Sequence, residues 1–290
     1  MTDPIISSWV KEKNNPLPQA FRQAVHTILF AISHSRDLYP QMIMKGAILL
    51  AIRHNCIRNT KDIDFSTIKM VREFDKDRFL SDLAGNLILA TDFLDYGIDC
   101  RIQSSKFKPS SPDASFPTLK IKVGYAYKHE RNSHKRLLAG NCSQVVEIDY
   151  SFNEATYSME KIVLENGGTL LAYSASDLIA EKFRAILQQR QRNRTRRQDV
   201  YDLYNLFHQR QPFTDEEKSK IFDSLVKKAA ARGITVERYC MRDPEIRRKS
   251  GKEYYHLQSE IIGELPEFDT AYNYVRSFYE DLPWSNIVLL

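Results

Sequence analysis

The chain has 290 residues, 42% of them hydrophobic and 27% charged, with a formal net charge of +5 at pH 7. This length allows one large domain or two ordinary ones, and no apolar run approaches the roughly 20 residues of a membrane helix. The four cysteines form no CxxC pair, which excludes zinc ribbons and disulfide frameworks, and no signal peptide is evident; we therefore expect a cytoplasmic protein without a membrane partner.

Residues 1–172 are predicted to form a mixed α/β domain. Apolar residues spaced three and four apart predict a helix over residues 18–34. The stretch "QMIMKG" is predicted to be a short buried strand that ends at Gly46. "AILLAIRHN" follows as a helix whose N-terminus lies close to that glycine, and a loop then leads to a strand that carries "DIDF".

The rest of this domain is predicted to contain one helix and three strands. The helix spans residues 71–86, and the strands show β-branched and aromatic residues in rough alternation. The strands are "DFLDYGIDCRIQ", "TLKIKVGYAYK" and "SQVVEIDYSF". Between the first two, the Ser- and Pro-rich stretch "SSKFKPSSPDASFP" is predicted to be a loop or an edge insertion.

Residues 173–290 are predicted to form a helical domain, which makes the fold class α+β. The stretches "SASDLIAEKFRAILQQRQ" and "RRQDVYDLYNLFHQR" have helical periodicity. Ser174 or Ser176 can cap the first of these helices, because a side-chain oxygen there can accept a hydrogen bond from a free amide of the first turn. The C-terminal part of this domain carries no motif that indicates a function.

Two carboxylates, Asp62 and Asp64, flank Ile63 in the "DIDF" strand. Successive side chains of a strand point to opposite faces, so both acids share one face and Ile63 turns inward. Two carboxylates this close repel unless a cation or a proton lies between them. Oxygen ligands of this kind suit Mg²⁺ or Mn²⁺ rather than zinc. On their own, the two acids could equally be ordinary turn residues.

The surroundings of the acid pair favour a nucleotide site. The helix after Gly46 begins with free N–H groups and the positive end of its dipole, which favour a phosphate, and glycine leaves room for one. A phosphate-binding turn beside a cation-binding pair forms the two halves of a nucleoside-triphosphate site. In "VVEIDYS", alternation places Glu147 and Asp149 on one face; either could complete a three-carboxylate set for two cations, and we favour Asp149.

The predicted helical domain contributes three more candidates. Lys182 lies among apolar residues in "DLIAEKFRAIL", and Asp199 and Asp202 are three residues apart, so they are neighbours on one helix face. From the pattern alone, Lys182 is best explained as a lysine whose stem covers apolar surface. The aspartates are then best explained by the helix dipole or by pairing with arginine.

A basic cluster lies between the two predicted helices of this domain. Such a cluster favours a phosphate-rich partner such as RNA, although a solvated helix face or loop would have the same composition. The arginines in question fall within the stretch "RQRNRTRR" and are Arg190, Arg192, Arg194, Arg196 and Arg197.

Four stretches of this chain resemble the AbiEii/AbiGii-type toxins of the nucleotidyltransferase superfamily. They are "MKGAILLA", "RNTKDIDF", "SASDLIAEKFRAIL" and "RRQDVYDLYNL", and they occur in the order found in that family. The resemblance implies a small mixed sheet with flanking helices, joined to a helical C-terminal domain, with the active site in the cleft between them. It also implies transfer of a nucleotide from an NTP to an acceptor, which is the tRNA acceptor end in some members.

The same resemblance implies roles for individual residues. Asp62, Asp64, Lys182 and Asp199 would be catalytic, Asp62 and Asp64 would hold magnesium, and Lys182 would contact the triphosphate; Asp149, favoured above from strand alternation, would be the third metal ligand. The nucleotide-binding residues would be Lys45, Gly46, Ala47, Thr60 and Lys182. Family members are usually toxins of two-gene systems with a winged-helix, DNA-binding antitoxin, and they are often linked to phage defence.

The turn after the first strand departs from the family pattern. The family usually has Gly-Gly or Gly-Ser there, whereas this chain has Gly46-Ala47, so no serine hydroxyl is available to hold a phosphate. Nucleotide transfer has three alternatives. The first is phosphotransfer from an NTP to a protein, and the second is a non-enzymatic RNA- or antitoxin-binding protein with a degenerate site, as Ala47 would allow. The third is a glycosyltransferase that uses Asp-x-Asp for a nucleotide sugar. The strand-Gly-helix unit and Lys182 argue against the glycosyltransferase.

Overall fold

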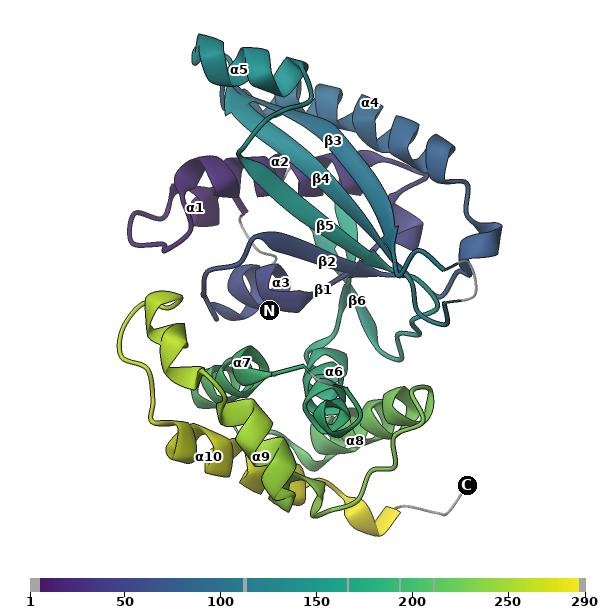
Figure 1. Cartoon of the computed structure of the whole chain (residues 1–290), viewed down its shortest axis with the longest axis vertical. Helices are drawn as coiled ribbons and strands as arrows, with labels where there is room; N and C mark the ends of the chain where they lie inside the picture. Colours follow the sequence, from purple (N-terminus) through teal and green to yellow (C-terminus); the bar gives the residue numbers. More distant parts are fainter. Residues whose placement is uncertain (1–5, 112–113, 166, 193, 211, 287–290) are drawn as a thin grey trace. The chain divides into compact units, whose positions relative to one another are not determined.

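The chain folds into a first unit with a seven-stranded sheet and a second unit made mainly of helices (Figure 1). The computed structural model describes residues 6–111, 114–165, 167–192, 194–210 and 212–286. Unit 1 is Met1–Ala172 and unit 2 is Tyr173–Leu290. Within the described ranges, no helix is both long and apolar enough to cross a membrane.

The sheet of unit 1 is mixed, with strands in the order β3-β4-β5-β2-β1-β7-β6. β2 runs antiparallel to β1 and parallel to β5, while β4 runs antiparallel to both β3 and β5. The strands are β1 (Ile43–Lys45), β2 (Asp62–Ser66), β3 (Ile98–Lys108), β4 (Thr118–Tyr127), β5 (Val145–Ser151), β6 (Met159–Val163) and β7 (Thr169–Tyr173).

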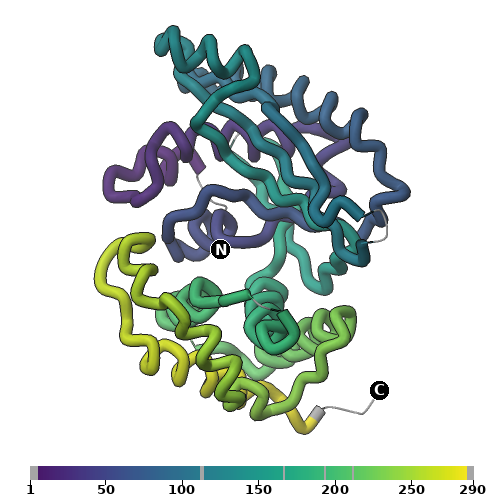
Figure 2. The backbone as a smooth tube through the Cα atoms, viewed as in Figure 1, coloured from purple at the N-terminus to yellow at the C-terminus, as the bar shows by residue number. Residues whose placement is uncertain are grey.

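Helices α2 and α4 pack against each other and against the sheet (Figures 1 and 2). Their buried residues Leu29 and Leu83 belong to the same core as Ile121 and Ile148 of the sheet, and each of these side chains is fully buried. On β2 and β5, the side chains that alternate with this core are partly exposed and mostly polar. The helices of this unit are α1 (Ile6–Lys11), α2 (Gln19–His34), α3 (Gly46–His54), α4 (Lys76–Leu94) and α5 (Arg131–Leu138).

The structure corrects three sequence predictions in unit 1. The predicted helix over 71–86 is a 3₁₀ turn followed by α4, which continues to Leu94 because its apolar spacing persists past the predicted end. The predicted strand over 92–103 therefore begins only at Ile98. Residues 104–108, predicted to lie in a loop or an edge insertion, form the end of the edge strand β3, where their polar side chains alternate; residues 112 and 113 of that stretch lie outside the described residues. Strands β6 and β7 were not predicted.

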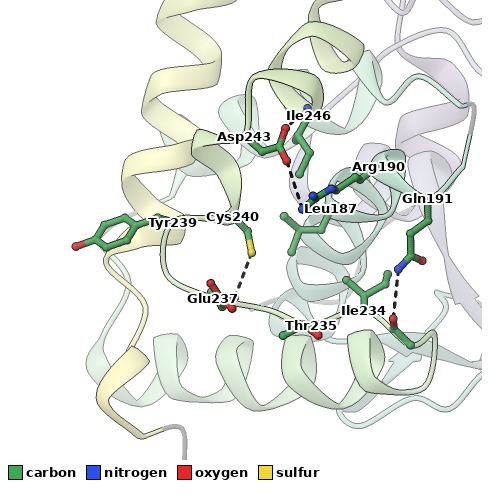
Figure 3. Close-up of a pocket in the computed structure, with 11 residues that line it drawn as sticks. Leu187, Arg190, Gln191, Ile234, Thr235, Glu237, Tyr239, Cys240, Asp243 and Ile246 are labelled. Carbon is green, nitrogen blue, oxygen red and sulfur yellow. Dashed lines mark hydrogen bonds and ion pairs between the residues drawn. The ribbon is translucent and has the colours of Figure 1, made fainter.

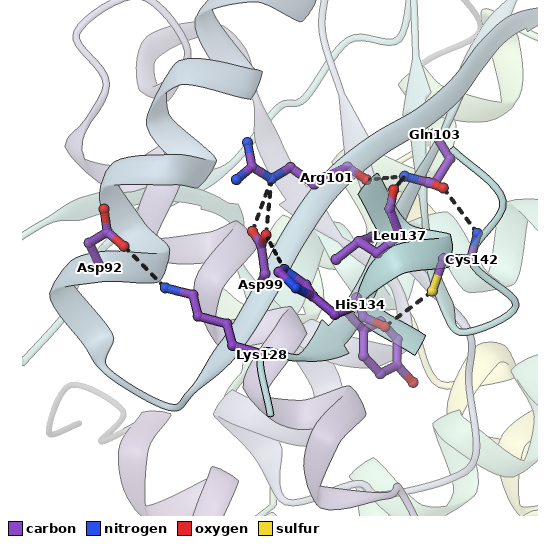
Figure 4. A network of polar contacts seen from close by, with 9 residues as sticks. Asp92, Asp99, Arg101, Gln103, Lys128, His134, Leu137 and Cys142 are labelled. Carbon is purple, nitrogen blue, oxygen red and sulfur yellow. Dashed lines mark hydrogen bonds and ion pairs between the residues drawn. The ribbon is translucent and has the colours of Figure 1, made fainter. Parts of the chain in front are cut away.

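A partly buried polar network links α5 to the edge strand β3 (Figure 4). The carboxylate of Asp99 on β3 is 2% exposed, and it accepts hydrogen bonds from Arg101 Nε at 3.0 and 3.2 Å. His134 Nε2, from α5, lies 3.0 Å from the same carboxylate. Because a buried carboxylate is stable only when it is paired, this network fixes the position of α5 on β3.

Unit 2 begins with α6, whose start matches the sequence prediction. The Ser174 side chain accepts a hydrogen bond from the Asp177 backbone amide, so Ser174 rather than Ser176 is the N-cap. Phe183 and Phe207 are buried in this unit beside Phe278. The α-helices are α6 (Ala175–Leu187), α7 (Arg197–Gln209), α8 (Asp215–Ala230), α9 (Pro244–Gly251) and α10 (Phe268–Glu280). The mixed sheet with flanking helices and the helical C-terminal part confirm the predicted fold class.

Candidate functional site

Asp62 and Asp64 lie on β2 and point away from the helix-covered face of the sheet. Ile63 and Phe65, which alternate with them, are fully buried. The predicted alternation is therefore confirmed, and both carboxylates lie on the polar face. The Thr60 hydroxyl donates a hydrogen bond to Asp62 Oδ1, which orients that carboxylate.

β5 supplies the third carboxylate from the adjacent, parallel strand. In the pairing of β2 with β5, Asp64 is opposite Asp149 and Asp62 is opposite Glu147. Carboxylate oxygens of Asp62, Asp64 and Asp149 all lie within 4.8 Å of one another, and Glu147 is not part of this group. The three acids, here called the carboxylate triad, come from two strands that are far apart in the sequence, and the pairing of β2 with β5 brings them together.

The donor set of the carboxylate triad fits a hard divalent cation. It offers only oxygen ligands, all three residues are partly exposed, and no histidine or cysteine joins the group. Mg²⁺ and Mn²⁺ prefer such ligands and leave coordination positions for water or for substrate phosphates. Without a cation, three carboxylates at this separation repel one another.

Gly46 begins α3 directly beside Asp64. Its φ is +78°, a conformation that L residues rarely adopt, and a Cβ at this position would lie 2.7 Å from Asp64 Cγ. The N-cap residue of this helix, Lys45, makes no side-chain hydrogen bond to the first-turn amides, and such amides can donate to a ligand. Ala47, the next residue, is buried, so position 47 can contribute its backbone amide only.

Lys45 precedes this glycine and forms an ion pair with Glu154, a residue that was not among the predicted site residues. Its Nζ lies 2.7 Å from Glu154 Oε1, and both side chains are about one-tenth exposed. In the strand pairing Lys45 is opposite Asp64. Lys45 and Asp64 are thus cross-strand neighbours, and the Lys45 ammonium group is held by Glu154.

Lys120 on β4 is a further residue at the site that sequence reasoning missed. Its Nζ donates to both oxygens of Asp149, at 2.8 and 2.7 Å, and lies 3.9 Å from Glu147. Burial disfavours the ammonium form, but the bond to Asp149 outweighs it, and the pKa of Lys120 is raised. Alternation in "TLKIKV" could have placed Lys120 on a polar face, but not next to Asp149.

In unit 2, Lys182 is held between the two aspartates that the sequence singled out. Its Nζ lies 2.9 Å from Asp199 Oδ1 and 2.7 Å from Asp202 Oδ2. Asp202 is 1% exposed, and Arg196 lies 3.6 Å from the other oxygen of Asp199. The predicted helix face is therefore confirmed, and the two carboxylates fix the direction of the ammonium group.

The arginines of the basic cluster have different surroundings. Arg197 forms ion pairs with Glu253 at 3.0 Å and with Glu260 at 3.1 Å, so its guanidinium charge is balanced by carboxylates of unit 2. Arg192 and Arg194 are exposed.

Arg190, the first arginine of the cluster, lines a cavity of about 660 Å³ in unit 2, where it lies 3.6 Å from Asp243 (Figure 3). This cavity contains no other predicted site residue.

Residues 27–274 match the sequence pattern of the family "Nucleotidyl transferase AbiEii toxin, Type IV TA system". A comparison with curated protein sequences finds no match.

Two solved structures share the fold. One is a protein from H. pylori that is provisionally assigned as a nucleotidyltransferase, with a TM-score of 0.52 and 17% identity over 91% of this chain and 96% of that one. The other is MenT4, a nucleotidyltransferase toxin from Mycobacterium tuberculosis H37Rv, with a TM-score of 0.53 and 12% identity over 96% of this chain and 89% of that one.

Proposed function

Because the chain belongs to the AbiEii nucleotidyl transferase toxin family of type IV toxin–antitoxin systems, we propose that it is a metal-dependent enzyme that transfers a nucleotide from an NTP to RNA. The observation that carries the proposal is the carboxylate triad beside the start of α3 at Gly46. The proposed acceptor is the acceptor end of tRNA.

Asp62, Asp64 and Asp149 would hold Mg²⁺ or Mn²⁺. The bound cation would supply positive charge against the phosphates of the NTP, where charge develops during transfer. Thr60 would keep the Asp62 carboxylate in place through its hydroxyl. Since phosphoryl chemistry needs little covalent help, positioning and electrostatics would account for most of the rate.

The NTP phosphates would lie against the start of α3. Backbone amides of Gly46 and Ala47 can donate there, the dipole of the helix favours negative charge, and Lys45 adds a cation one residue earlier. This arrangement uses amides in place of the serine hydroxyl that the chain lacks.

Unit 2 would contribute Lys182 and Asp199 to the reaction. Lys182 would neutralise charge on the triphosphate, and its direction is fixed by the bonds to Asp199 and Asp202. The exposed arginines Arg192 and Arg194 would contact an RNA backbone, together with Arg190, Arg196 and Arg197.

The biological setting of this proposal is a two-gene system in the cytoplasm. The family is one of toxin–antitoxin pairs, and we propose a winged-helix, DNA-binding antitoxin and a role in phage defence. The adjacent upstream gene is the place to look for such an antitoxin.

The test uses two forms of each NTP, labelled at the α or the γ phosphorus, with purified protein, Mg²⁺ and total cellular RNA. Nucleotide transfer puts the α label into RNA and leaves the γ label in pyrophosphate. The γ label in a protein would instead indicate phosphotransfer, and RNA binding without either label would indicate a non-enzymatic protein.

Asp64→Asn is the variant that tests the carboxylate triad. It should abolish labelling while leaving the fold intact, since the change removes charge repulsion and no packing. Asp92→Asn is the matched control, because Asp92 is an exposed aspartate on α4. Full labelling by Asp64→Asn would overturn the proposed role of the triad.

A further inference from the structure

The carboxylate triad lies within a continuous row of charged residues that crosses five strands. Cα pairing places Lys106 of β3 opposite Lys120 of β4, and Lys120 opposite Asp149 of β5. The row continues from Asp149 to Asp64 of β2 and from there to Lys45 of β1. It therefore runs from the β3 edge of the sheet to the start of α3.

Two more lysines follow the same face. Lys122 of β4 is opposite Glu147 of β5 and lies 3.4 Å from it, and Lys108 ends β3 two residues after Lys106. Alternation confirms the common face, because Leu119 and Ile121, which alternate with the lysines of β4, are fully buried. We call Lys106, Lys108, Lys120 and Lys122 the lysine row.

The outer lysines of this row lack acidic partners. Lys106 and Lys108 are exposed and form no ion pair among the residues that the structure describes. Lys106 is also directly opposite Lys120, and like charges in that position destabilise a sheet. The exposed ammonium groups of Lys106 and Lys108 are therefore available to an external anion.

Protection of a sheet edge does not account for the whole row. Edge strands often carry lysine because it prevents pairing with other chains, and β3 is an edge strand. β4, however, lies between β3 and β5, yet it contributes Lys120 and Lys122 to the same face.

We propose that the lysine row binds the phosphate backbone of the RNA acceptor and leads it to the carboxylate triad. This inference rests on the proposed function. The acids separate two flanks of the sheet: β1 and Gly46 lie on one side and the lysine row on the other. The NTP phosphates would bind on the first flank, and the acceptor would bind across β3 and β4. Lys106 on β3 lies two strand spacings, or about 10 Å, from Asp149 on β5.

The chemistry of the row favours a polyanion over a protein acceptor. Protein interfaces depend on buried aromatic and apolar anchors, and none of the exposed large apolar side chains that the structure describes lies on β3 or β4. Ammonium groups without such anchors suit phosphate contacts, which are sequence-independent and sensitive to salt.

The experiment measures binding of a short fluorescein-labelled oligouridylate by anisotropy over a range of salt concentrations, without NTP. The test variant is Lys106→Gln/Lys108→Gln/Lys122→Gln, which leaves Lys120 and the acids intact. The control variant is Lys13→Gln/Lys135→Gln/Lys161→Gln, which removes the same charge from exposed lysines of unit 1 outside β3 and β4. Thermal unfolding checks that both variants are folded.

The test variant should bind about tenfold more weakly, and the slope of log K against log salt should fall by about 2, at roughly 0.7 per lost single-strand phosphate contact. The control should change neither value. Equal binding by the two variants, or no measurable binding by the unaltered protein, would overturn the proposal. Because binding is read without NTP, a failure of nucleotide transfer would be seen separately, in the labelling assay.

Discussion

Lys120 Nζ donates to both carboxylate oxygens of Asp149, at 2.8 and 2.7 Å, on adjacent antiparallel strands. Asp149 is also the acid that completes the carboxylate triad with Asp62 and Asp64. An ammonium group and a divalent cation would thus compete for the same oxygens, and Lys120 should lower the affinity of the triad for metal ions.

Replacing Lys120 by Met should therefore strengthen binding of Mn²⁺. The Asp149 oxygens would be freed and one positive charge would be removed from the site, so we expect about tenfold tighter binding, a change of roughly 1.4 kcal/mol. Titration of Mn²⁺ followed by electron paramagnetic resonance measures this without any reaction. Lys122→Met is the control, since Lys122 lies against Glu147 outside the triad. Unchanged or weaker Mn²⁺ binding in Lys120→Met would contradict the competition.

Gly46 should not tolerate even one added carbon. Gly46→Ala would place a Cβ 2.7 Å from Asp64 Cγ, at a φ of +78°. We expect the strained backbone to lower the free energy of unfolding by about 1–3 kcal/mol. We also expect weaker Mn²⁺ binding, because the Asp64 carboxylate has to move. Chemical denaturation and the same titration report the two effects.

Gly85→Ala is the control for this substitution. Gly85 lies in α4 with no atom within 4 Å of the added Cβ, and alanine should stabilise that helix by up to about 1 kcal/mol. If Gly46→Ala and Gly85→Ala have the same stability and the same Mn²⁺ affinity, the close approach of Gly46 to Asp64 is not needed for stability or for metal binding.

Local periodicity was enough to predict which side chains of each strand share a face. Alternation placed Asp62 with Asp64 and Glu147 with Asp149, and the structure confirms both. It could not show that β5 lies beside β2 with Asp149 opposite Asp64, because strand order is a long-range property of the sheet. The choice between Glu147 and Asp149 depended on that register.

The residues missed by sequence reasoning were missed for the same reason. Lys120 reaches Asp149 from β4, and Glu154 reaches Lys45 from the segment after β5. Neither contact has a local signal. Ser, Lys and Pro at the end of β3 are typical of loops, so they predict a loop or an edge insertion, whereas on an edge strand such residues form the solvent-facing row.

Removing only Asp202 should lower the stability of the protein more than replacing both Lys182 and Asp202 by apolar residues. Asp202→Ala would remove one of the two carboxylates that hold Lys182, which is 6% exposed, and breaking a buried pair in this way costs about 3 kcal/mol. The double variant Lys182→Met/Asp202→Leu should recover much of this stability, yet it should not label RNA. Thermal unfolding and the labelling assay separate the two roles.

The control for this pair is Glu216→Ala, which breaks the exposed Glu216–Lys220 pair on α8 and should have little effect. Recovery of labelling in the double variant would show that Lys182 is a structural residue only.

His26 should make the stability of unit 1 depend on pH. Burial on α2, opposed by the charge of Glu165, lowers the pKa of His26 to about 4, and its Nδ1 lies 2.8 Å from the Tyr96 hydroxyl. The unfolded chain, with a histidine pKa of about 6.5, therefore binds more protons than the folded chain between these two values. Stability is thus fully present above about pH 6.5 and falls as the pH drops toward 4.

Between about pH 7 and pH 5 the loss from this residue should be about 2 kcal/mol, measured by urea unfolding at each pH. His26→Gln should show a flatter dependence than the unaltered protein, because glutamine does not titrate. His256→Gln, at an exposed histidine of unit 2, should keep the full dependence. An equally steep pH dependence in His26→Gln would mean that other groups cause the acid sensitivity.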